Sequence, residues 1–156
     1  MNPRVGLGFD IHPFSDDPAR RLVLAGVDLG APGLSGHSDA DAVAHAVADA
    51  LLGAAGMGDI GEHFPDDDPA YAGIDSMELL GRVVLTVSSH HEIANVDVSV
   101  VLEAPKLAPH REEMQRRLGE IVGAPVSVKA KRAESLGALG RREGIACFAV
   151  ALLVPR

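Results

Sequence analysis

The C-terminal run Ile145–Val154 constrains the fold more than any other stretch, because apolar residues occupy both of its alternating faces. A strand that is apolar on both faces needs protein on both sides of it, which predicts the central strand of a sheet. As a helix, the run would be too short to span a bilayer. The chain of 156 residues has the length of one domain with its own hydrophobic core. We therefore expect residues 1–156 to form a single domain.

Hydrophobic periodicity divides the rest of the chain into short strands and three amphipathic helices. Apolar and polar residues alternate over Asn95–Glu103, which is typical of a half-buried strand. We expect Ser38 and Asp75 to cap the first two helices, and Gly53 and Gly56 to end the first. The order strand–strand–helix–helix–strand–helix–strand–strand predicts an α+β (mixed α/β) fold, with helices packed on one face of one mixed sheet. The remaining expected elements are strands over 4–9, 21–25 and 126–129, and helices over 38–52, 76–87 and 109–122.

Composition excludes several classes of function. The chain has 14 Lys and Arg against 22 Asp and Glu, for a net charge of -8. Such a chain binds neither nucleic acid nor an anionic membrane surface through general charge, although a metal ion can still recruit a small phosphorylated ligand. Aromatic residues make up only 3% of the sequence, which argues against base stacking on an aromatic platform. A single cysteine, Cys147, and the lack of a signal-peptide pattern lead us to expect a cytoplasmic protein.

Three residues have the types and the spacing of a metal site. Residues two apart in a strand point to the same side, so Asp10 and His12 present a carboxylate and an imidazole together. His45 falls within the first expected helix, and Asp41 and Asp49 share its helix face. His45 is either a buried histidine that hydrogen-bonds one of these carboxylates or the third ligand of a catalytic zinc site. In the second case, Asp41 or Asp49 would orient the imidazole.

Two further regions carry residues suited to ligand binding. The loop over 58–71 is rich in Gly, Pro and Asp, which serve either as turn residues or as partners for substrate hydroxyls. Glu134 is a candidate ligand for a hard divalent cation, which prefers oxygen. Basic residues near the strand ends form either a phosphate-binding cluster or a solvated face. They are Lys106, Lys131, Arg132, Arg141 and Arg142.

Together these motifs closely resemble the 2-C-methyl-D-erythritol 2,4-cyclodiphosphate synthase family along essentially the whole chain. Each motif is weak alone, but their order and spacing are specific in combination. The stretches that carry the resemblance are Gly8-Phe9-Asp10-Ile11-His12, His37-Ser38-Asp39-Ala40-Asp41, Asp49-Ala50-Leu51-Leu52-Gly53, Gly58-Asp59-Ile60-Gly61, Phe64-Pro65-Asp66, Asn95-Val96-Asp97-Val98, Ala104-Pro105-Lys106 and Glu143-Gly144-Ile145-Ala146.

The resemblance implies a homotrimer whose sheets face the threefold axis, with each active site between two subunits. It implies a zinc ion (Zn²⁺) held by Asp10, His12 and His45, and a second cation, Mg²⁺ or Mn²⁺, held by Glu134 and bridging the substrate diphosphate. The implied substrate is 4-diphosphocytidyl-2-C-methyl-D-erythritol 2-phosphate, whose own 2-phosphate displaces CMP in the non-mevalonate isoprenoid pathway. Because the nucleophile is part of the substrate, such a lyase must chiefly orient its substrate and neutralise charge.

Roles for other residues follow from the same resemblance. His37 and Ser38 match positions near the 2-phosphate, and His37 and Arg132 are the expected catalytic residues. Other substrate-binding positions are implied in the acidic loop, in a segment that binds cytidine largely through its backbone, and in the basic loop. They are Asp59, Ile60, Gly61, Phe64, Asp66, Asp68, Ala104, Pro105, Lys106, Leu107, Ala108, Lys131 and Arg141.

The sequence departs from the family pattern in one loop. Lys131-Arg132-Ala133 stands where many relatives have threonines, one of which donates a hydrogen bond to phosphate. A guanidinium at Arg132 can reach a phosphate but cannot replace the hydroxyl, and we expect it to point into the site. Ala138 and Arg142 also replace a common Phe and a common Gly. Two other functions stay open: a zinc-dependent phosphohydrolase, and a trimeric nucleotide or isoprenoid-phosphate binder without turnover.

Overall fold

The C-terminal strand is central, as predicted. A computed structural model of the chain describes residues 2–156. Its main sheet has the order β1-β6-β4-β5, so β6 lies between two partners. Strands β4 and β5 are parallel and the other pairs are antiparallel, which confirms a mixed sheet. The strands are β1 (Arg4–Pro13), β4 (His91–Val101), β5 (Val126–Lys131) and β6 (Gly144–Pro155).

A separate two-stranded sheet corrects the prediction of one sheet. Strand β2 (Arg21–Leu24) was expected, but β3 (Val27–Pro32) was not, and the two pair as an antiparallel hairpin. Their turn is Ala25-Gly26, with φ angles of 53° and 71°. A two-residue turn with both φ angles positive usually contains Asn-Gly or Asp-Gly, so Ala-Gly gives a weak signal in the sequence.

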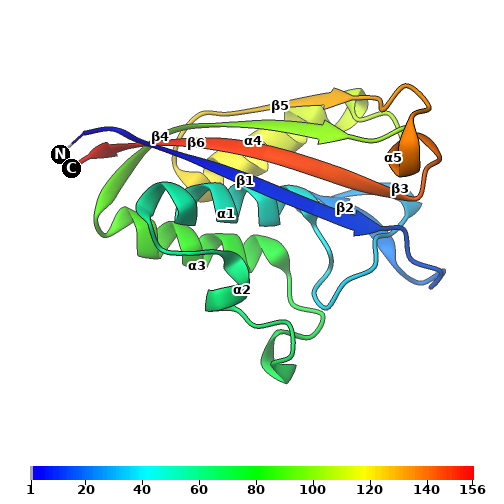
Figure 1. The fold of residues 1–156 in the computed structure, drawn as a ribbon, viewed down its shortest axis with the longest axis horizontal. Coiled ribbons are helices and arrows are strands. Elements are labelled where there is room, and N and C mark those ends of the chain that lie inside the picture. Colours follow the sequence, from blue (N-terminus) through cyan, green and yellow to red (C-terminus); the bar gives the residue numbers. More distant parts are fainter. Residues whose placement is uncertain (1) are drawn as a thin grey trace.

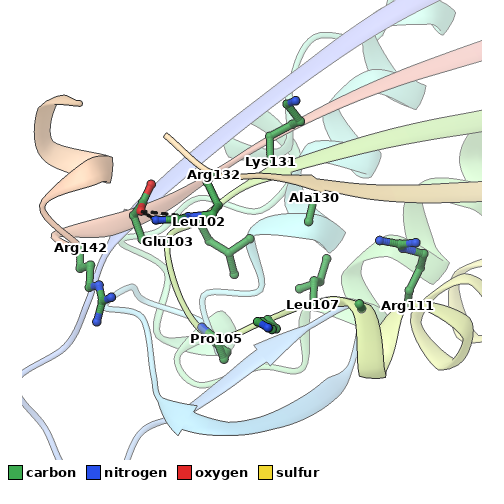
Figure 2. A pocket seen from close by; sticks show the side chains of 11 residues that line it. Leu102, Glu103, Pro105, Leu107, Arg111, Ala130, Lys131, Arg132 and Arg142 are labelled. Atoms are coloured by element: carbon green, nitrogen blue, oxygen red, sulfur yellow. Dashed lines mark hydrogen bonds and ion pairs between the residues drawn. The ribbon is translucent and has the colours of Figure 1, made fainter. Parts of the chain in front are cut away.

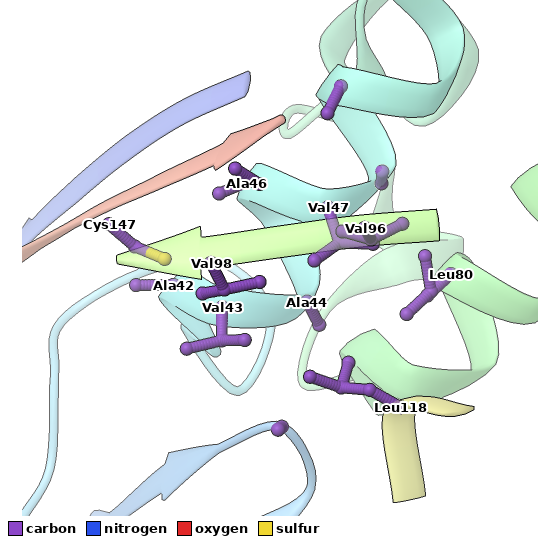
Figure 3. Close-up of a cluster of buried hydrophobic side chains, with 14 of the residues drawn as sticks. Ala42, Val43, Ala44, Ala46, Val47, Leu80, Val96, Val98, Leu118 and Cys147 are labelled. Carbon is purple, nitrogen blue, oxygen red and sulfur yellow. The ribbon is translucent and has the colours of Figure 1, made fainter. Parts of the chain in front are cut away.

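Three helices pack on one face of the main sheet, as predicted (Figure 1). They are α1 (Ala42–Ala55), α3 (Ser76–Ser88) and α4 (Arg111–Val122). Figure 3 shows their apolar side chains meeting those of β4 and β6 in the core. Within residues 2–156, no helix is long and apolar enough to cross a membrane. The loops also contain α2 (Ile60–His63), α5 (Gly137–Gly140) and the 3₁₀ turns η1 (Pro69–Tyr71) and η2 (Ala108–His110).

The start of α1 differs from the prediction. Ser38 is not its N-cap, because the helix begins four residues later and Asp41 accepts the capping hydrogen bond from the Ala44 amide. Asp41 also accepts from the backbone of the β2–β3 turn, which fixes it at this place. Gly53 lies inside the helix, whereas Gly56 ends it with a left-handed φ of 73°. Asp75 caps α3 as expected, accepting from the Met77 amide.

Strand β1 lies unusually close to α1. A Cβ atom at Gly6 would lie 1.9 Å from the Ala50 carbonyl oxygen, and one at Gly8 would lie 1.8 Å from that of Ala46. Only glycine permits this approach, since no real Cβ comes so near to backbone. The close contact brings the C-terminal end of β1 next to the first turn of α1, and this is where the candidate metal ligands meet.

Among residues 2–156, no helix covers the opposite face of the sheet, and a row of apolar side chains is exposed there (Figure 1). Leu7 on β1 is 67% exposed and Phe148 on β6 is 42% exposed. The rings of Phe9 and Phe148 touch on this face, with their centroids 5.0 Å apart. Apolar side chains on β1 and β6 together form what we call the open face. They are Val5, Leu7, Phe9, Ile11, Phe148 and Val150.

Candidate functional site

Asp10, His12 and His45 come together as the sequence predicts. Asp10 and His12 lie on one side of β1, and His45 projects from α1. Asp10 Oδ2 is 2.8 Å from His12 Nε2 and 3.3 Å from His45 Nδ1. The three ligand atoms all lie within 4.8 Å of one another, and the three side chains are half-buried. One cation could therefore contact all three.

The hydrogen bonds of His12 fit a metal ligand. Its Nδ1 lies 2.9 Å from the Ser35 carbonyl oxygen, which can only accept, so the proton of the neutral ring is on Nδ1. Its Nε2 is buried and has no hydrogen bond within the described chain, although the Asp10 carboxylate is close. A lone pair on Nε2 thus points at the place where the three side chains converge. Two imidazoles and a carboxylate are a donor set that suits zinc and similar divalent ions.

The ionisation of Asp10 and His12 is mutually dependent. Burial by itself raises the pKa of Asp10, but the nearby His12 and His45 outweigh it and bring the pKa below its usual value. Burial lowers the pKa of His12, and the Asp10 carboxylate outweighs that effect and raises it. The carboxylate is therefore kept ionised, as metal binding requires, and a metal ion would displace the proton of His12.

The three ligands open into a cavity of about 460 Å³ that we call the metal cavity. It contains most of the residues that the resemblance implies near the 2-phosphate and the methylerythritol part. Tyr71, which the sequence did not single out, also lines it and packs edge-on against Phe64, with ring centroids 5.4 Å apart. The expected residues on its wall are His37, Ser38, Ile60, Gly61, Phe64 and Asp66.

Two expected carboxylates of this loop act as helix caps in the structure. Asp59 accepts from the Glu62 amide at the start of α2, and Asp68 accepts from the Ala70 amide at the start of η1. Neither is among the residues that line the metal cavity. The Asp68 carbonyl oxygen accepts a hydrogen bond from His37 Nε2 at 3.0 Å, so this residue positions the cavity wall through its backbone.

The carboxylates expected to orient His45 do not contact its ring. Both carboxylate oxygens of Asp41 accept hydrogen bonds from backbone amides. Asp49 accepts a hydrogen bond from the Ile60 amide at 2.7 Å. Burial raises the pKa of Asp41 to about 6. The ring of His45 instead meets Ser76, whose Oγ lies 2.8 Å from its Nε2. Ser76 directly follows the cap residue Asp75 and lies 31 residues from His45 in the sequence. Nothing in the sequence around Ser76 indicates this contact.

Figure 2 shows a second cavity, of about 400 Å³, which we call the basic cavity. It combines the segment expected to bind cytidine with the end of β5. Ala104 lies outside its wall and lines a neighbouring apolar hollow, and Arg141 pairs with Glu143 at 2.6 Å rather than facing the cavity. Five cationic side chains contribute to the wall, and of these Arg111 was not expected. The lining residues are Leu102, Glu103, Pro105, Lys106, Leu107, Ala108, Arg111, Ala130, Lys131, Arg132 and Arg142.

Glu103 and Arg132 form an ion pair on the wall of the basic cavity (Figure 2). Arg132 Nη2 lies 3.1 Å from Glu103 Oε2, and the Glu103 side chain is only 3% exposed while that of Arg132 is 63% exposed. Burial raises the pKa of Glu103, but Arg132 and the backbone amides of Ala133 and Ser135 outweigh it and lower the pKa. The sequence pattern placed Glu103 on the polar side of the strand expected over 95–103. In the structure, β4 ends at Val101, so Glu103 lies beyond the strand.

Glu134 lies two residues after Arg132, in a loop whose backbone takes left-handed φ angles. Glu134 and Ser135 have left-handed φ angles of 53° and 61° although neither is glycine. Glu134 is exposed and is not part of the group formed by Asp10, His12 and His45. The metal cavity and the basic cavity have no lining residue in common within residues 2–156.

These features define an α+β protein with a candidate metal site of one carboxylate and two imidazoles, and a separate cavity lined by cations. The chain belongs to the YgbB family, which it matches over residues 3–154.

Curated relatives agree with this assignment. The chain is 49% identical over 157 residues to the 2-C-methyl-D-erythritol 2,4-cyclodiphosphate synthase of Symbiobacterium thermophilum, covering 97% of this chain and 99% of the relative. It is 48% identical over 153 residues to the bifunctional enzyme IspD/IspF of Anaeromyxobacter dehalogenans, covering 96% of this chain but only 39% of that protein. The solved IspF of Plasmodium falciparum in a CDP complex is 32% identical, with a TM-score of 0.86 over 99% of this chain and 97% of that one.

Proposed function

We propose that this chain converts 4-diphosphocytidyl-2-C-methyl-D-erythritol 2-phosphate to 2-C-methyl-D-erythritol 2,4-cyclodiphosphate with release of CMP, in the non-mevalonate isoprenoid pathway. The observation that carries the proposal is the group of Asp10, His12 and His45 on the wall of the metal cavity. The name of the full-length Symbiobacterium relative supports the same activity. In this proposal residues 1–156 act as one cyclodiphosphate synthase domain.

Two cations complete the proposed site. Zn²⁺ would be held by Asp10, His12 and His45, and Mg²⁺ or Mn²⁺ by Glu134. When bound, such ions act as Lewis acids on phosphate oxygens. The buried lone pair of His12 Nε2 supports the first assignment. Support for the second is the place of Glu134 in the chain, directly after Arg132 and Ala133 at the edge of the basic cavity.

The proposed work of the protein side chains is to orient the substrate and to neutralise its charge. The substrate brings its own nucleophile, so the enzyme gains most by holding the 2-phosphate in line with the bond that breaks. His37 and Ser38 stand beside the metal ligands in the metal cavity and would hold that phosphate. Asp66 and the backbone around Ile60 and Gly61 would bind the methylerythritol hydroxyls. Phe64 would pack against the carbon skeleton, while Asp59 and Asp68 would act by capping the loop.

The basic cavity is the proposed place of the cytidine diphosphate part. CDP is named in the Plasmodium falciparum complex, which supports a nucleotide in this fold. Ala104, Pro105, Leu107 and Ala108 would recognise the base through backbone groups, which a chain with few aromatic residues requires. Cationic side chains near the diphosphate would stabilise charge that develops as CMP leaves. They are Lys106, Lys131, Arg132 and, from the rim, Arg141.

A homotrimer with sheets facing the threefold axis is the proposed assembly, and two observations support it. The open face leaves large apolar side chains of β1 and β6 in solvent, which marks an interaction surface. In addition, the metal cavity and the basic cavity share no residue within the described chain, so one substrate bridging both is best served by two subunits. The partners are thus a small nucleotide substrate and two further copies of this chain. The cytoplasm is the proposed compartment, in keeping with a single, buried cysteine.

Light scattering at micromolar concentration tests the assembly. We expect the mass of a trimer, and we expect Leu7→Glu to shift it toward the monomer, because a carboxylate on the open face would have to be desolvated. Leu85→Glu is the matched control, since Leu85 is also exposed but lies on α3. A monomer mass for the unaltered chain would overturn the shared-site proposal.

Product analysis in ¹⁸O-labelled water tests the activity. The proposed cyclase yields equimolar CMP and a cyclic diphosphate that contains no oxygen from solvent, because the attacking oxygen belongs to the substrate. A phosphohydrolase would incorporate solvent oxygen, and a binder without turnover would release no CMP. Either of these results would refute the proposal.

A further inference from the structure

A chain of hydrogen bonds leads from His45 away from the metal ligands. His45 Nδ1 faces Asp10, and on the far side of the ring Nε2 lies 2.8 Å from Ser76 Oγ. Ser76 is the first residue of α3 and is 1% exposed. Its hydroxyl in turn donates to the Asp39 carboxylate, which also accepts from the Ser76 backbone amide at 3.1 Å. Ser76, at the centre of the arrangement, is buried, whereas His45 and Asp39 are half-buried, so water has little access to the Ser76 hydroxyl.

The direction of these hydrogen bonds follows from counting protons. A serine hydroxyl has one proton, and an ionised carboxylate can only accept. Once Ser76 gives its proton to Asp39, its oxygen can only accept from His45. The Asp10 carboxylate can also accept, but it lies 3.3 Å from Nδ1, whereas Ser76 Oγ lies 2.8 Å from Nε2. The shorter contact therefore places the proton of the neutral imidazole on Nε2. The lone pair of the ring is then on Nδ1, the atom that faces Asp10 and His12.

We propose that Ser76 and Asp39 are positioning residues that hold His45 in the Nε2–H tautomer, with Nδ1 free to bind a metal ion. The inference rests on the proposed metal site. It adds Ser76, which lies outside the quoted motifs, and gives a role to Asp39, which lies within one of them. The carboxylate at the end of the chain also makes the imidazole a stronger donor to the metal, since it stabilises positive charge that develops on the ring.

His12 shows why Asp39 is needed. The Ser35 carbonyl oxygen sets the tautomer of His12 alone, because a carbonyl cannot donate. A serine hydroxyl can donate or accept, so Ser76 by itself would allow both tautomers of His45. Ser38 Oγ lies 3.2 Å from the same Nε2 and has the same ambiguity. Asp39 removes the ambiguity at Ser76, which makes the shorter of the two contacts with Nε2, so the two histidines present opposite ring nitrogens, Nε2 and Nδ1, to one point.

Nitrogen NMR of the full-length chain, stripped of metal and held at a pH where imidazoles are neutral, tests the relay. We expect the unaltered protein to show His45 protonated on Nε2 alone. Ser76→Ala and Asp39→Asn should each give a mixture of tautomers, because an amide at position 39 can donate to Ser76 and reverse the chain. Ser76→Thr keeps the hydroxyl and should keep the single tautomer. Ser89→Ala, at the exposed end of α3, is the control.

Zinc affinity, measured by competition with a chelator, is the second readout. We expect Ser76→Ala and Asp39→Asn to weaken binding by about 10- to 100-fold, and Ser76→Thr and Ser89→Ala to leave it near that of the unaltered chain. A single Nε2–H tautomer in both Ser76→Ala and Asp39→Asn would overturn the relay. Since the tautomer is read without metal or substrate, absence of cyclase activity in the unaltered chain would refute the proposed function and leave this result standing.

Discussion

The metal cavity takes its ligands from within one strand and one helix, whereas the basic cavity takes its charges from loops and from the ends of elements. Asp10 and His12 stand on a strand that touches α1 through glycines, and His45 stands inside that helix. Arg132, by contrast, is 63% exposed and follows the end of β5, and its known partner is a single carboxylate, Glu103. Left-handed residues on either side of the short α5 give this loop its shape.

The difference shows which part of the site has its geometry held by core packing and which part can accept substitutions. At the metal cavity, moving a ligand would require moving β1 against α1, so core packing itself holds the geometry. In the basic cavity, side chains can change without disturbing the core. The departures from the family pattern lie on the wall of this cavity, at Lys131, Arg132 and Arg142, or in the loop between β5 and β6, at Ala133 and Ala138.

The largest expected effect on stability comes from adding one methyl group to β1 near the candidate metal ligands. Gly8→Ala would press a Cβ against the Ala46 carbonyl, 1.8 Å away, and should lower the free energy of unfolding by about 3 kcal/mol or more. Gly137→Ala, in the loop, meets nothing within 4 Å and has only a φ of +63° to accommodate, so it should cost about 1 kcal/mol. Urea denaturation of both variants measures the contrast. Equal costs would show that the two regions are equally constrained.

The same contrast explains what the sequence could predict. Spacing of two residues in a strand and an apolar run on both faces of another are local signals, and they correctly predicted Asp10 with His12 and the central place of β6. The cap of α1 was wrong because several Ser and Asp residues compete there, and the choice of Asp41 depends on the distant β2–β3 turn. Ser76 was missed for the same reason, since it lies 31 residues from His45.

In the loop, local signals were weaker still. A run of basic residues predicts a charged surface but not which side chain faces inward, so Arg142 lines the basic cavity while Arg141 turns to Glu143. The carboxylates of the acidic loop were expected at the substrate. Asp66 lines the metal cavity, whereas Asp59 and Asp68 cap short helices and do not line it. The turn chemistry of Asp suits both roles, and only tertiary packing decides between them.

The next effect concerns a buried charge beside the metal cavity. Burial raises the pKa of Asp41 from 3.8 to about 6, so between these pH values the folded protein binds more protons than the unfolded chain. The free energy of unfolding should therefore fall as the pH rises through this window, by about 3 kcal/mol for a shift of about two units. Asp41→Asn has no carboxylate to ionise and should not show this fall.

Denaturation at several pH values measures it. The stability gap between the unaltered chain and Asp41→Asn should shrink as the pH rises from about 4 to about 7. Glu143→Gln, which removes an exposed carboxylate of the basic region, should follow the unaltered chain within about 0.5 kcal/mol. A gap for Asp41→Asn that is constant with pH would contradict the prediction.

The smallest effect is expected at Arg132. If its guanidinium donates to the diphosphate, Arg132→Ala should lower kcat and kcat/KM together, by about tenfold, since the contact forms mainly in the transition state. Steady-state kinetics of CMP release measures this, with Arg116→Ala on the exposed side of α4 as the control. Activity within about twofold of the unaltered enzyme would show that Glu103 retains the guanidinium. Lys106, Lys131 and the metals would then be the groups that neutralise charge.

The zinc content of purified chains tests the central claim most directly, namely that Asp10, His12 and His45 form one preorganised metal site. We predict one zinc ion per chain in the unaltered protein and in His63→Ala, whose ring binds the Met57 carbonyl outside the ligand group. We predict loss of that zinc in His45→Ala, because two remaining ligands hold zinc weakly. Undiminished, stoichiometric zinc in His45→Ala would remove His45 from the ligand set and contradict the account.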